Sequence, residues 1–169
     1  FINACGDLGA SIQSALQQLC NFTDASRAAL FLFSMETGIV SNSHEWCANP
    51  AESRQPMLQN IALDDFPYMA SLLFRGEDAI LGCREDLPQS TAAPEREYLD
   101  RHGFRPAFCV PLQFEQNLLG MLCIYGHANE SRQWAAWLSP ILRLVGNSMV
   151  SACMRQNRNA DLALERAHL

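Results

Sequence analysis

Residues 108–126 read FCVPLQFEQNLLGMLCIYG, and this stretch decides the fold. Two apolar runs flank the polar segment EQN at 115–117, which is the pattern of two strands joined by a short turn. Pro106 and Pro111 fit the start of a strand or a sheet edge, because proline cannot donate a backbone hydrogen bond to a neighbouring strand. The stretch therefore predicts an antiparallel hairpin that spans residues 104–127.

A second hairpin is predicted nearer the N-terminus. Residues 27–35, RAALFLFSM, are almost wholly apolar, as expected for a strand that is buried on both faces. The segment ETG provides the turn, and residues 39–47, IVSNSHEWC, return as the partner strand. A further strand is expected at 78–83, whereas residues 48–63 are polar and irregular.

Helical spacing of apolar residues marks four further segments. They are residues 10–20, a stretch from Asp64 or Asp65 to Gly76, residues 94–102, and a last element that begins near Asn129 or Ser131 and runs to the chain end. Asp64 and Asp65 stand where a helix cap is expected, with Pro67 in the first turn. Helices that alternate with paired strands predict an α+β domain around an antiparallel sheet.

Composition narrows the function classes. The chain has 169 residues, of which 49% are hydrophobic and 18% charged, as in an ordinary globular domain. A net charge of −6 and the lack of a basic run argue against nucleic-acid binding. All 12 basic residues are arginine, which excludes mechanisms that need a lysine. Pro140 and Arg143 interrupt the C-terminal apolar run, so we expect no membrane span.

The cysteines predict a reducing compartment. There are seven of them, an odd number, and no two have the CxxC spacing. Reduced thiols in a cytoplasmic protein explain this pattern better than a disulfide framework does. The chain begins at Phe1 and ends inside a helical pattern, so we expect a piece of a longer protein.

Four segments together resemble a GAF domain, a small-molecule sensor module related in architecture to PAS domains. They are VSNSHEWC at 40–47, LQNIALDDFPYM at 58–69, the closing hairpin at 108–126, and RQWAAWLSPILRLVGNSM at 132–149. The likeness runs from about Leu8 to Gln156. It implies an α+β, GAF/PAS-like fold with a central antiparallel sheet of five to six strands, the N- and C-terminal helices on one face and a ligand cavity on the other. Residues 1–156 would form this single domain, and 157–169 would begin a helix that leads to a linked output domain.

The residues of VSNSHEWC raise the question of catalysis or metal binding. Side chains alternate along a strand, so Asn42, His44 and Trp46 are expected on one face and Glu45 and Cys47 on the other. A Cys–His nucleophilic pair and a zinc site both need their members to converge. We therefore expect no catalytic residues and no metal site.

The resemblance instead implies a ligand pocket, whose ligand or cofactor it leaves unknown. The candidate contacts are His44, Trp46, Phe66, Tyr68, Met69, Leu72 and Cys109. Core packing remains the alternative for each of them, since apolar residues at helical spacing usually face a core. Arg84 and Arg105 could meet an anionic ligand, but surface arginines usually face solvent. Asp86 is expected to bond to local backbone in a turn.

The predicted function is a non-catalytic sensory module of a bacterial signalling protein of the sensor kinase or diguanylate cyclase type. It would form a homodimer through its terminal helices. The cyclic-nucleotide GAF motif and the Asp-Ile-Pro and Cys-His signatures of bilin-binding GAF domains are missing, which argues against cyclic GMP and a covalent chromophore. Two alternatives remain: a degenerate GAF domain that only dimerises, and a thiol-based methionine sulfoxide reductase of GAF fold.

Overall fold

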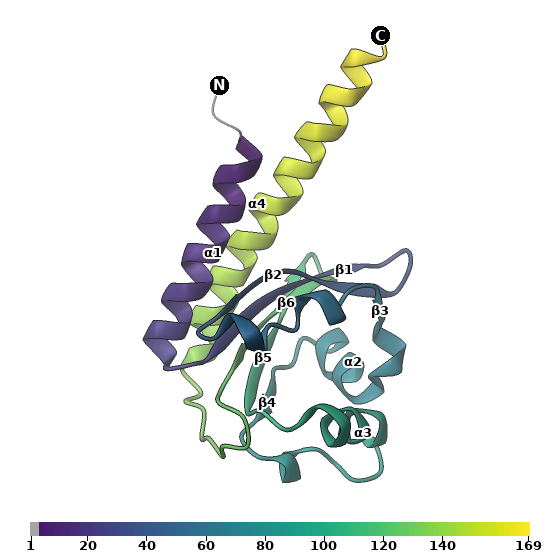
Figure 1. Cartoon of the computed structure of the whole chain (residues 1–169). Coiled ribbons are helices and arrows are strands. Elements are labelled where there is room, and N and C mark those ends of the chain that lie inside the picture. The colour runs from purple at the N-terminus through teal and green to yellow at the C-terminus, as the bar shows by residue number, and fades with distance from the viewer. Residues whose placement is uncertain (1–3) are drawn as a thin grey trace.

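The structure is a computed structural model that describes residues 4–169, with side chains described from residue 7 onward. Its centre is a six-stranded antiparallel sheet with the strand order β3-β2-β1-β6-β5-β4 (Figure 1). The strands are β1 (Arg27–Ser34), β2 (Ile39–Cys47), β3 (Ile61–Ala62), β4 (Ala79–Leu81), β5 (Ala107–Phe114) and β6 (Asn117–Tyr125). Both predicted hairpins are present, and they join through the pairing of β1 with β6.

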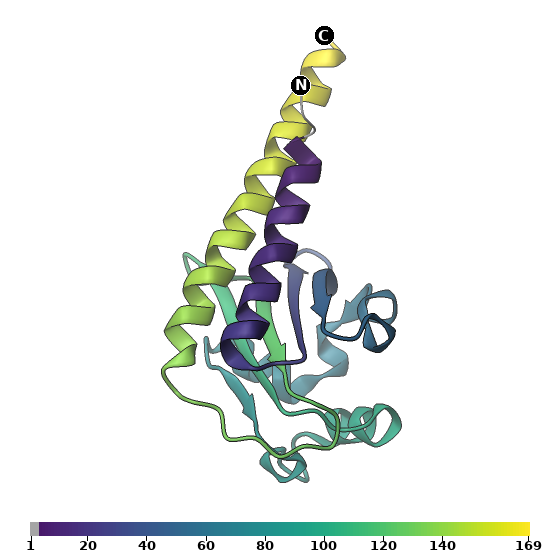
Figure 2. The same cartoon turned by 60° about the vertical axis from the view of Figure 1, so that its left-hand side comes forward.

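Helices cover both faces of the sheet. α1 (Ala4–Thr23) and α4 (Leu138–Ala167) lie side by side on one face, and α4 continues well past the sheet (Figures 1 and 2). α2 (Pro67–Phe74) and α3 (Ala93–His102) lie on the opposite face. Four 3-10 helices lie in the connections: η1 (Pro50–Glu52), η2 (Gln55–Met57), η3 (Leu63–Asp65) and η4 (Arg84–Asp86). The predicted α+β architecture, with the terminal helices on one face, is confirmed.

The sheet separates two hydrophobic cores. Beneath α1 and α4, buried residues include Ile12, Leu16, Leu30, Val110, Leu122, Leu142 and Val150. Beneath α2, they include Phe31, Leu63, Leu73, Cys109 and Cys123. Successive residues of β1 alternate between these cores, since Leu30 belongs to the first and Phe31 to the second. Burial of β1 on both faces explains why its sequence is almost continuously apolar.

The prolines of the closing hairpin have the predicted placement. Pro111 lies within β5 opposite Met121, but β4 pairs only with residues 107–109 of β5. The missing N–H of Pro111 therefore costs no hydrogen bond to β4, because that strand has already ended. Glu115 and Gln116 form the turn with positive φ angles of 49° and 67°, as in a two-residue hairpin turn whose twist matches the strands.

The start of the last helix was predicted wrongly. α4 begins at Leu138, not near Asn129 or Ser131, because tertiary contacts hold the preceding residues in a non-helical path. The backbone N–H of Arg132 donates to Gly82 O at 2.9 Å, and Trp134 Nε1 donates to Leu81 O at 3.3 Å.

The short strand β3, which pairs with β2, was also missed. It lies in the segment predicted to be irregular. None of the helices within residues 4–169 combines the length and apolarity needed to cross a membrane.

Candidate functional site

A cavity of about 180 Å³ lies between the sheet and its α2–α3 cover. Strands β1, β2 and β6 contribute to one side of it, and the segments from β3 to α2, around β4 and η4, and in α3 contribute to the rest. Apolar side chains dominate the wall: Phe31, Val40, Leu58, Ile61, Leu63, Phe66, Met69, Leu73, Leu81, Leu87, Leu99 and Met121. The remaining lining residues are Arg27, Glu95, Tyr98 and Tyr125.

Two of the lining residues carry buried polar atoms that lack a partner. Arg27 is 7% exposed and Glu95 is 5% exposed. Within the described part of the chain, Arg27 Nε and Glu95 Oε2 are buried without a hydrogen bond. Leaving a buried donor or acceptor unsatisfied costs roughly 1–3 kcal/mol, so each of these two atoms costs the folded protein stability.

Glu95 also holds the start of α2. Its Oε1 accepts hydrogen bonds from the backbone N–H groups of Tyr68 at 2.7 Å and Met69 at 3.1 Å. The cap residue itself is Phe66, which offers no side-chain acceptor. The prediction that Asp64 or Asp65 caps this helix is therefore wrong. Both lie in η3, and a carboxylate from a distant helix takes their place.

Arg27 is held between a ring and a carboxylate. Its guanidinium carbon lies 3.9 Å from the centroid of the Tyr125 ring, and its Nη1 lies 3.3 Å from Glu45 Oε2. Burial raises the pKa of the Tyr125 phenol well above its usual value. Tyr125 therefore stays neutral at physiological pH, while Glu45 balances the charge of Arg27.

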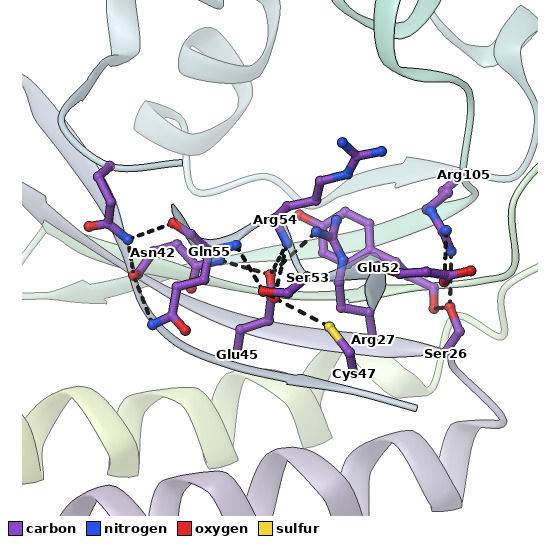
Figure 3. Close-up of polar contacts among 12 residues, drawn as sticks. Ser26, Arg27, Asn42, Glu45, Cys47, Glu52, Ser53, Arg54, Gln55 and Arg105 are labelled. Carbon is purple, nitrogen blue, oxygen red and sulfur yellow. Dashed lines mark hydrogen bonds and ion pairs between the residues drawn. The ribbon is translucent and has the colours of Figure 1, made fainter. Parts of the chain in front are cut away.

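Glu45 is the centre of a buried hydrogen-bond network (Figure 3). Its carboxylate accepts from Ser53 Oγ at 2.6 Å, Asn42 Nδ2 at 3.0 Å and the Arg54 backbone N–H at 3.1 Å. Burial alone would raise the pKa of Glu45, but the hydrogen bonds and the Arg27 charge outweigh it and lower the pKa below its usual 4.5. The network ties β1, β2 and the η1–η2 segment together beside the cavity.

A bulge in β2 changes which side chains share a face. Leu30 pairs with His44 and Phe31 with Asn42, so Ser43 is an extra residue in β2. Ser43 Oγ donates to Leu30 O at 3.1 Å, and Gln55 Nε2 donates to Ser43 O at 3.0 Å. The predicted alternation is thus wrong at Asn42, which lies on the face of Glu45 and not on that of His44.

The seven sequence-predicted contacts do not all meet at the cavity. Phe66 and Met69 line it. Trp46 packs against the core beneath α1 and α4, and His44 lies on that same face opposite Leu30.

The other three belong to the second core and are not among the lining residues. Leu72 and Cys109 are buried in it, and Tyr68 packs against it. Sequence reasoning missed Arg27, Glu45 and Glu95. Arg27, at the start of an otherwise apolar strand, carries a usable signal. Glu45 lies in a strand with several other polar residues, and Glu95 resembles an ordinary acidic residue in the first turn of a helix.

The other polar candidates have local partners. Arg84 pairs with Asp100, and Arg105 Nη2 pairs with Glu52 Oε2 at 2.8 Å. Asp86 accepts the backbone N–H groups of Gly82 and Cys83, as predicted. No group of His, Cys, Asp and Glu among the described residues is arranged to hold a metal ion.

The environment of the thiols disfavours nucleophilic chemistry. Burial raises the pKa of Cys20 and of Cys47 to about 12. It also raises the pKa of Cys83 and Cys153, while a hydrogen bond between Cys109 and Cys123, together with burial, raises the pKa of Cys109. The thiolate is the reactive form, so a raised pKa leaves less of it at neutral pH.

Comparison with protein families decides the assignment. The sequence model of the GAF domain matches residues 7–152, which is most of the chain. The chain belongs to the GAF domain family. This GAF domain has no match among curated proteins.

Solved structures share the fold at low sequence identity. GAF3 of Slr1393 from Synechocystis sp. PCC6803, solved in its photoproduct state, is 18% identical with a TM-score of 0.70, and 92% of this chain covers 98% of that one. A GAF domain/HD domain protein from Geobacter sulfurreducens is 15% identical with a TM-score of 0.68, at 89% and 94% coverage. The phytochrome photosensory core module of Stigmatella aurantiaca is 19% identical with a TM-score of 0.68, and 92% of this chain covers 34% of that larger one.

The cavity does not fit a chromophore held through a thioether. Such a link needs a cysteine at the cavity wall, and no cysteine of the described chain is among the lining residues.

Proposed function

We propose that this GAF domain is a non-catalytic sensory module of a bacterial signalling protein, which binds one small molecule in the cavity and relays its presence through α4 to a linked output domain. The observation that carries this proposal is the apolar cavity with two unpartnered buried polar atoms, Arg27 Nε and Glu95 Oε2. Ligand sites combine a mostly apolar wall with a few placed polar groups. A ligand that satisfied both atoms would remove a cost that the protein alone bears.

A direct contact supports the relay. Arg143 of α4 donates from Nη2 to Gly76 O at 2.9 Å and to Asp78 Oδ1 at 2.5 Å. Gly76 follows α2, whose residues Met69 and Leu73 line the cavity. A ligand that repositioned α2 would therefore displace a backbone carbonyl bonded to α4, and α4 continues beyond the sheet (Figure 1).

Dimerisation through the terminal helices is the second part of the proposal. Leu144 is 72% exposed on α4. Phe22 at the end of α1 and Trp137 just before α4 form an exposed aromatic pair with their ring centroids 5.9 Å apart. These apolar side chains favour a homodimer, and they are also the observation that favours the rival role of a GAF domain that only dimerises.

Native mass spectrometry of the purified domain tests the ligand part. We expect a small molecule to stay bound to the wild-type protein under gentle conditions. The Met69→Trp variant should lose the bound molecule, because the larger indole side chain would extend from α2 into the cavity. The matched control is Met57→Trp, since Met57 is 51% exposed and outside the cavity wall. A bare wild-type protein, or a ligand retained by Met69→Trp, would contradict the proposal, and a bare dimer would favour the dimerisation-only role.

A further inference from the structure

The hydrogen-bond inventory of the cavity constrains the chemistry of its ligand. Glu95 has one oxygen, Oε1, committed to the N-terminus of α2, and a second, Oε2, that is buried without a partner, and the residue belongs to the cavity wall. A carboxylate oxygen can only accept, so its partner must be an N–H or O–H donor. The other unpartnered atom, Arg27 Nε, can only donate, so it requires an acceptor.

Arg27 and Glu95 are the two charged side chains of the cavity wall, and only Arg27 has an ion-pair partner among the described residues. Arg27 is paired with Glu45, whose carboxylate lies on its Nη1. No ion pair within the described residues involves Glu95. The backbone N–H groups at the start of α2 are the partners of the Glu95 carboxyl group, and they bond only to its Oε1, so Oε2 can still accept a hydrogen bond.

The aromatic side chains of the cavity wall also favour a positively charged ligand. Tyr98 lies against Phe66 in an edge-to-face arrangement with ring centroids 5.5 Å apart, and both line the cavity. The faces of aromatic rings carry negative partial charge and attract cations that have been removed from water. Tyr98 and Glu95 both belong to α3, three residues apart, which places them on one side of that helix.

We propose that the ligand is an apolar molecule that bears a protonated amine, with the nitrogen donating to Glu95 Oε2 and an acceptor elsewhere on the molecule receiving Arg27 Nε–H. This inference rests on the proposed role of the cavity as a ligand site. An anionic ligand would place like charge against Glu95, and an uncharged hydrocarbon would leave both polar atoms unpartnered.

Two matched sets of probes test this proposal. Each set keeps one ring skeleton and changes only the end group: phenethylamine, 2-phenylethanol and 3-phenylpropanoate, and the corresponding tryptamine, tryptophol and indole-3-propionate. Dissociation constants are measured by ligand-observed NMR against the whole 169-residue chain. We expect the amine of each set to bind at least about tenfold more tightly than the acid, which is about 1.4 kcal/mol.

Glu95→Gln separates the ligand role of this residue from its structural role. The amide oxygen can still accept the Tyr68 and Met69 N–H groups, while the free position becomes an NH₂ donor. The amine preference should fall by about tenfold or more, and the melting temperature should not fall, because the bonds to the start of α2 are kept. Glu97→Gln is the matched control, because Glu97 lies on the same helix, pairs with Arg101 and has a side chain that is 65% exposed.

The outcomes distinguish the two proposals. Acids that bind as tightly as amines, or an amine preference that survives Glu95→Gln, would overturn this inference. Binding of the alcohols alone would also overturn this inference. If Met69→Trp abolished that binding, the cavity would still be a ligand site. Failure of every probe to bind, together with a bare protein in native mass spectrometry, would overturn the proposed function and this inference with it.

Discussion

Glu45 is the single residue whose charge organises the largest part of the site. Its side chain is 2% exposed and pairs with Arg27, whose side chain is 8% exposed. Removal of one partner of a buried ion pair typically costs 3–5 kcal/mol, because the other charge is left without compensation. Isolated in sequence, Glu45 is one acidic residue in a strand. In the structure it anchors the η1–η2 segment through Ser53 and Arg54.

The lowered pKa of Glu45 predicts an acid-sensitive fold. A carboxyl whose folded pKa lies below its unfolded value contributes stability that is fully present above the unfolded pKa and is lost as the pH falls through the folded pKa. The free energy of unfolding, measured by urea denaturation, should therefore decrease below about pH 4.5, the usual value for this group. The Glu45→Gln variant should be less stable at neutral pH, and its free energy of unfolding should decrease less as the pH falls.

The control for this pH experiment is Glu36→Gln, which removes one charge from the exposed turn between β1 and β2. That variant should keep the wild-type pH dependence. If Glu45→Gln lost as much stability at low pH as the wild-type protein, other carboxyl groups would be the cause of the acid sensitivity.

Replacement of glycine by alanine should have opposite effects on stability at Gly120 and at Gly9. A Cβ at Gly120 in β6 would lie 2.1 Å from Phe31 O of the neighbouring strand, and backbone cannot easily move away. Gly120→Ala should therefore destabilise by about 3 kcal/mol or more. Gly9 of α1 has no atom within 4 Å of the same position, so Gly9→Ala should stabilise by roughly 0.5–1 kcal/mol. Thermal and urea unfolding check both signs, and a neutral Gly120→Ala would contradict the close approach of β1.

Among the elements, α2 joins the cavity to the outer helix. Its N-terminus depends on Glu95 of α3, and the turn that follows it bonds to Arg143 of α4. The ion pair of Arg143 with Asp78 is partly exposed, since the side chains are 33% and 15% exposed. Exposed pairs of this kind contribute about 0–1 kcal/mol, so the contact can communicate a shift without dominating stability.

Arg143→Gln should separate binding from relay. We expect the bound small molecule to slow hydrogen exchange in the first turns of α4 in the wild-type protein and to leave these turns unchanged in the variant. Affinity should stay the same, because Arg143 is not among the cavity-lining residues. Arg155→Gln, further along α4, provides the control. A ligand response that persists in Arg143→Gln would place the relay elsewhere.

On the scale of the whole molecule, the sheet separates the cavity from the terminal helices. The cavity lies under α2 and α3, whereas the terminal helices α1 and α4, which carry the exposed Phe22 and Leu144, lie on the opposite face of the sheet (Figure 1). In the function proposed above, a ligand in the cavity would therefore leave the surface of the terminal helices accessible to a second copy.

Leu144→Arg tests the association. A charged side chain at this position, which is 72% exposed in one chain, should shift a dimer toward monomer in sedimentation velocity at high micromolar concentration. Met57→Arg changes an exposed methionine on η2, away from the terminal helices, and should leave the association unchanged. A wild-type monomer at that concentration would contradict the dimer.

The sequence by itself determined five of the six strands of the described sheet, both hairpins, the order of the helices and the family, because these follow from local apolar periodicity, turn residues and short motifs. Phe66 and Met69 were predicted as ligand contacts because the residues around them resemble the cover of a GAF pocket. Both line the cavity, and the ligand contact itself stays a prediction. Only the tertiary structure decided which polar groups meet there. One bulge at Ser43 moves Asn42 to the other face, because a shift of one residue reverses every side chain beyond it. Glu95 reaches α2 across 26 and 27 residues of sequence, a contact that exists only once the two helices pack over the sheet.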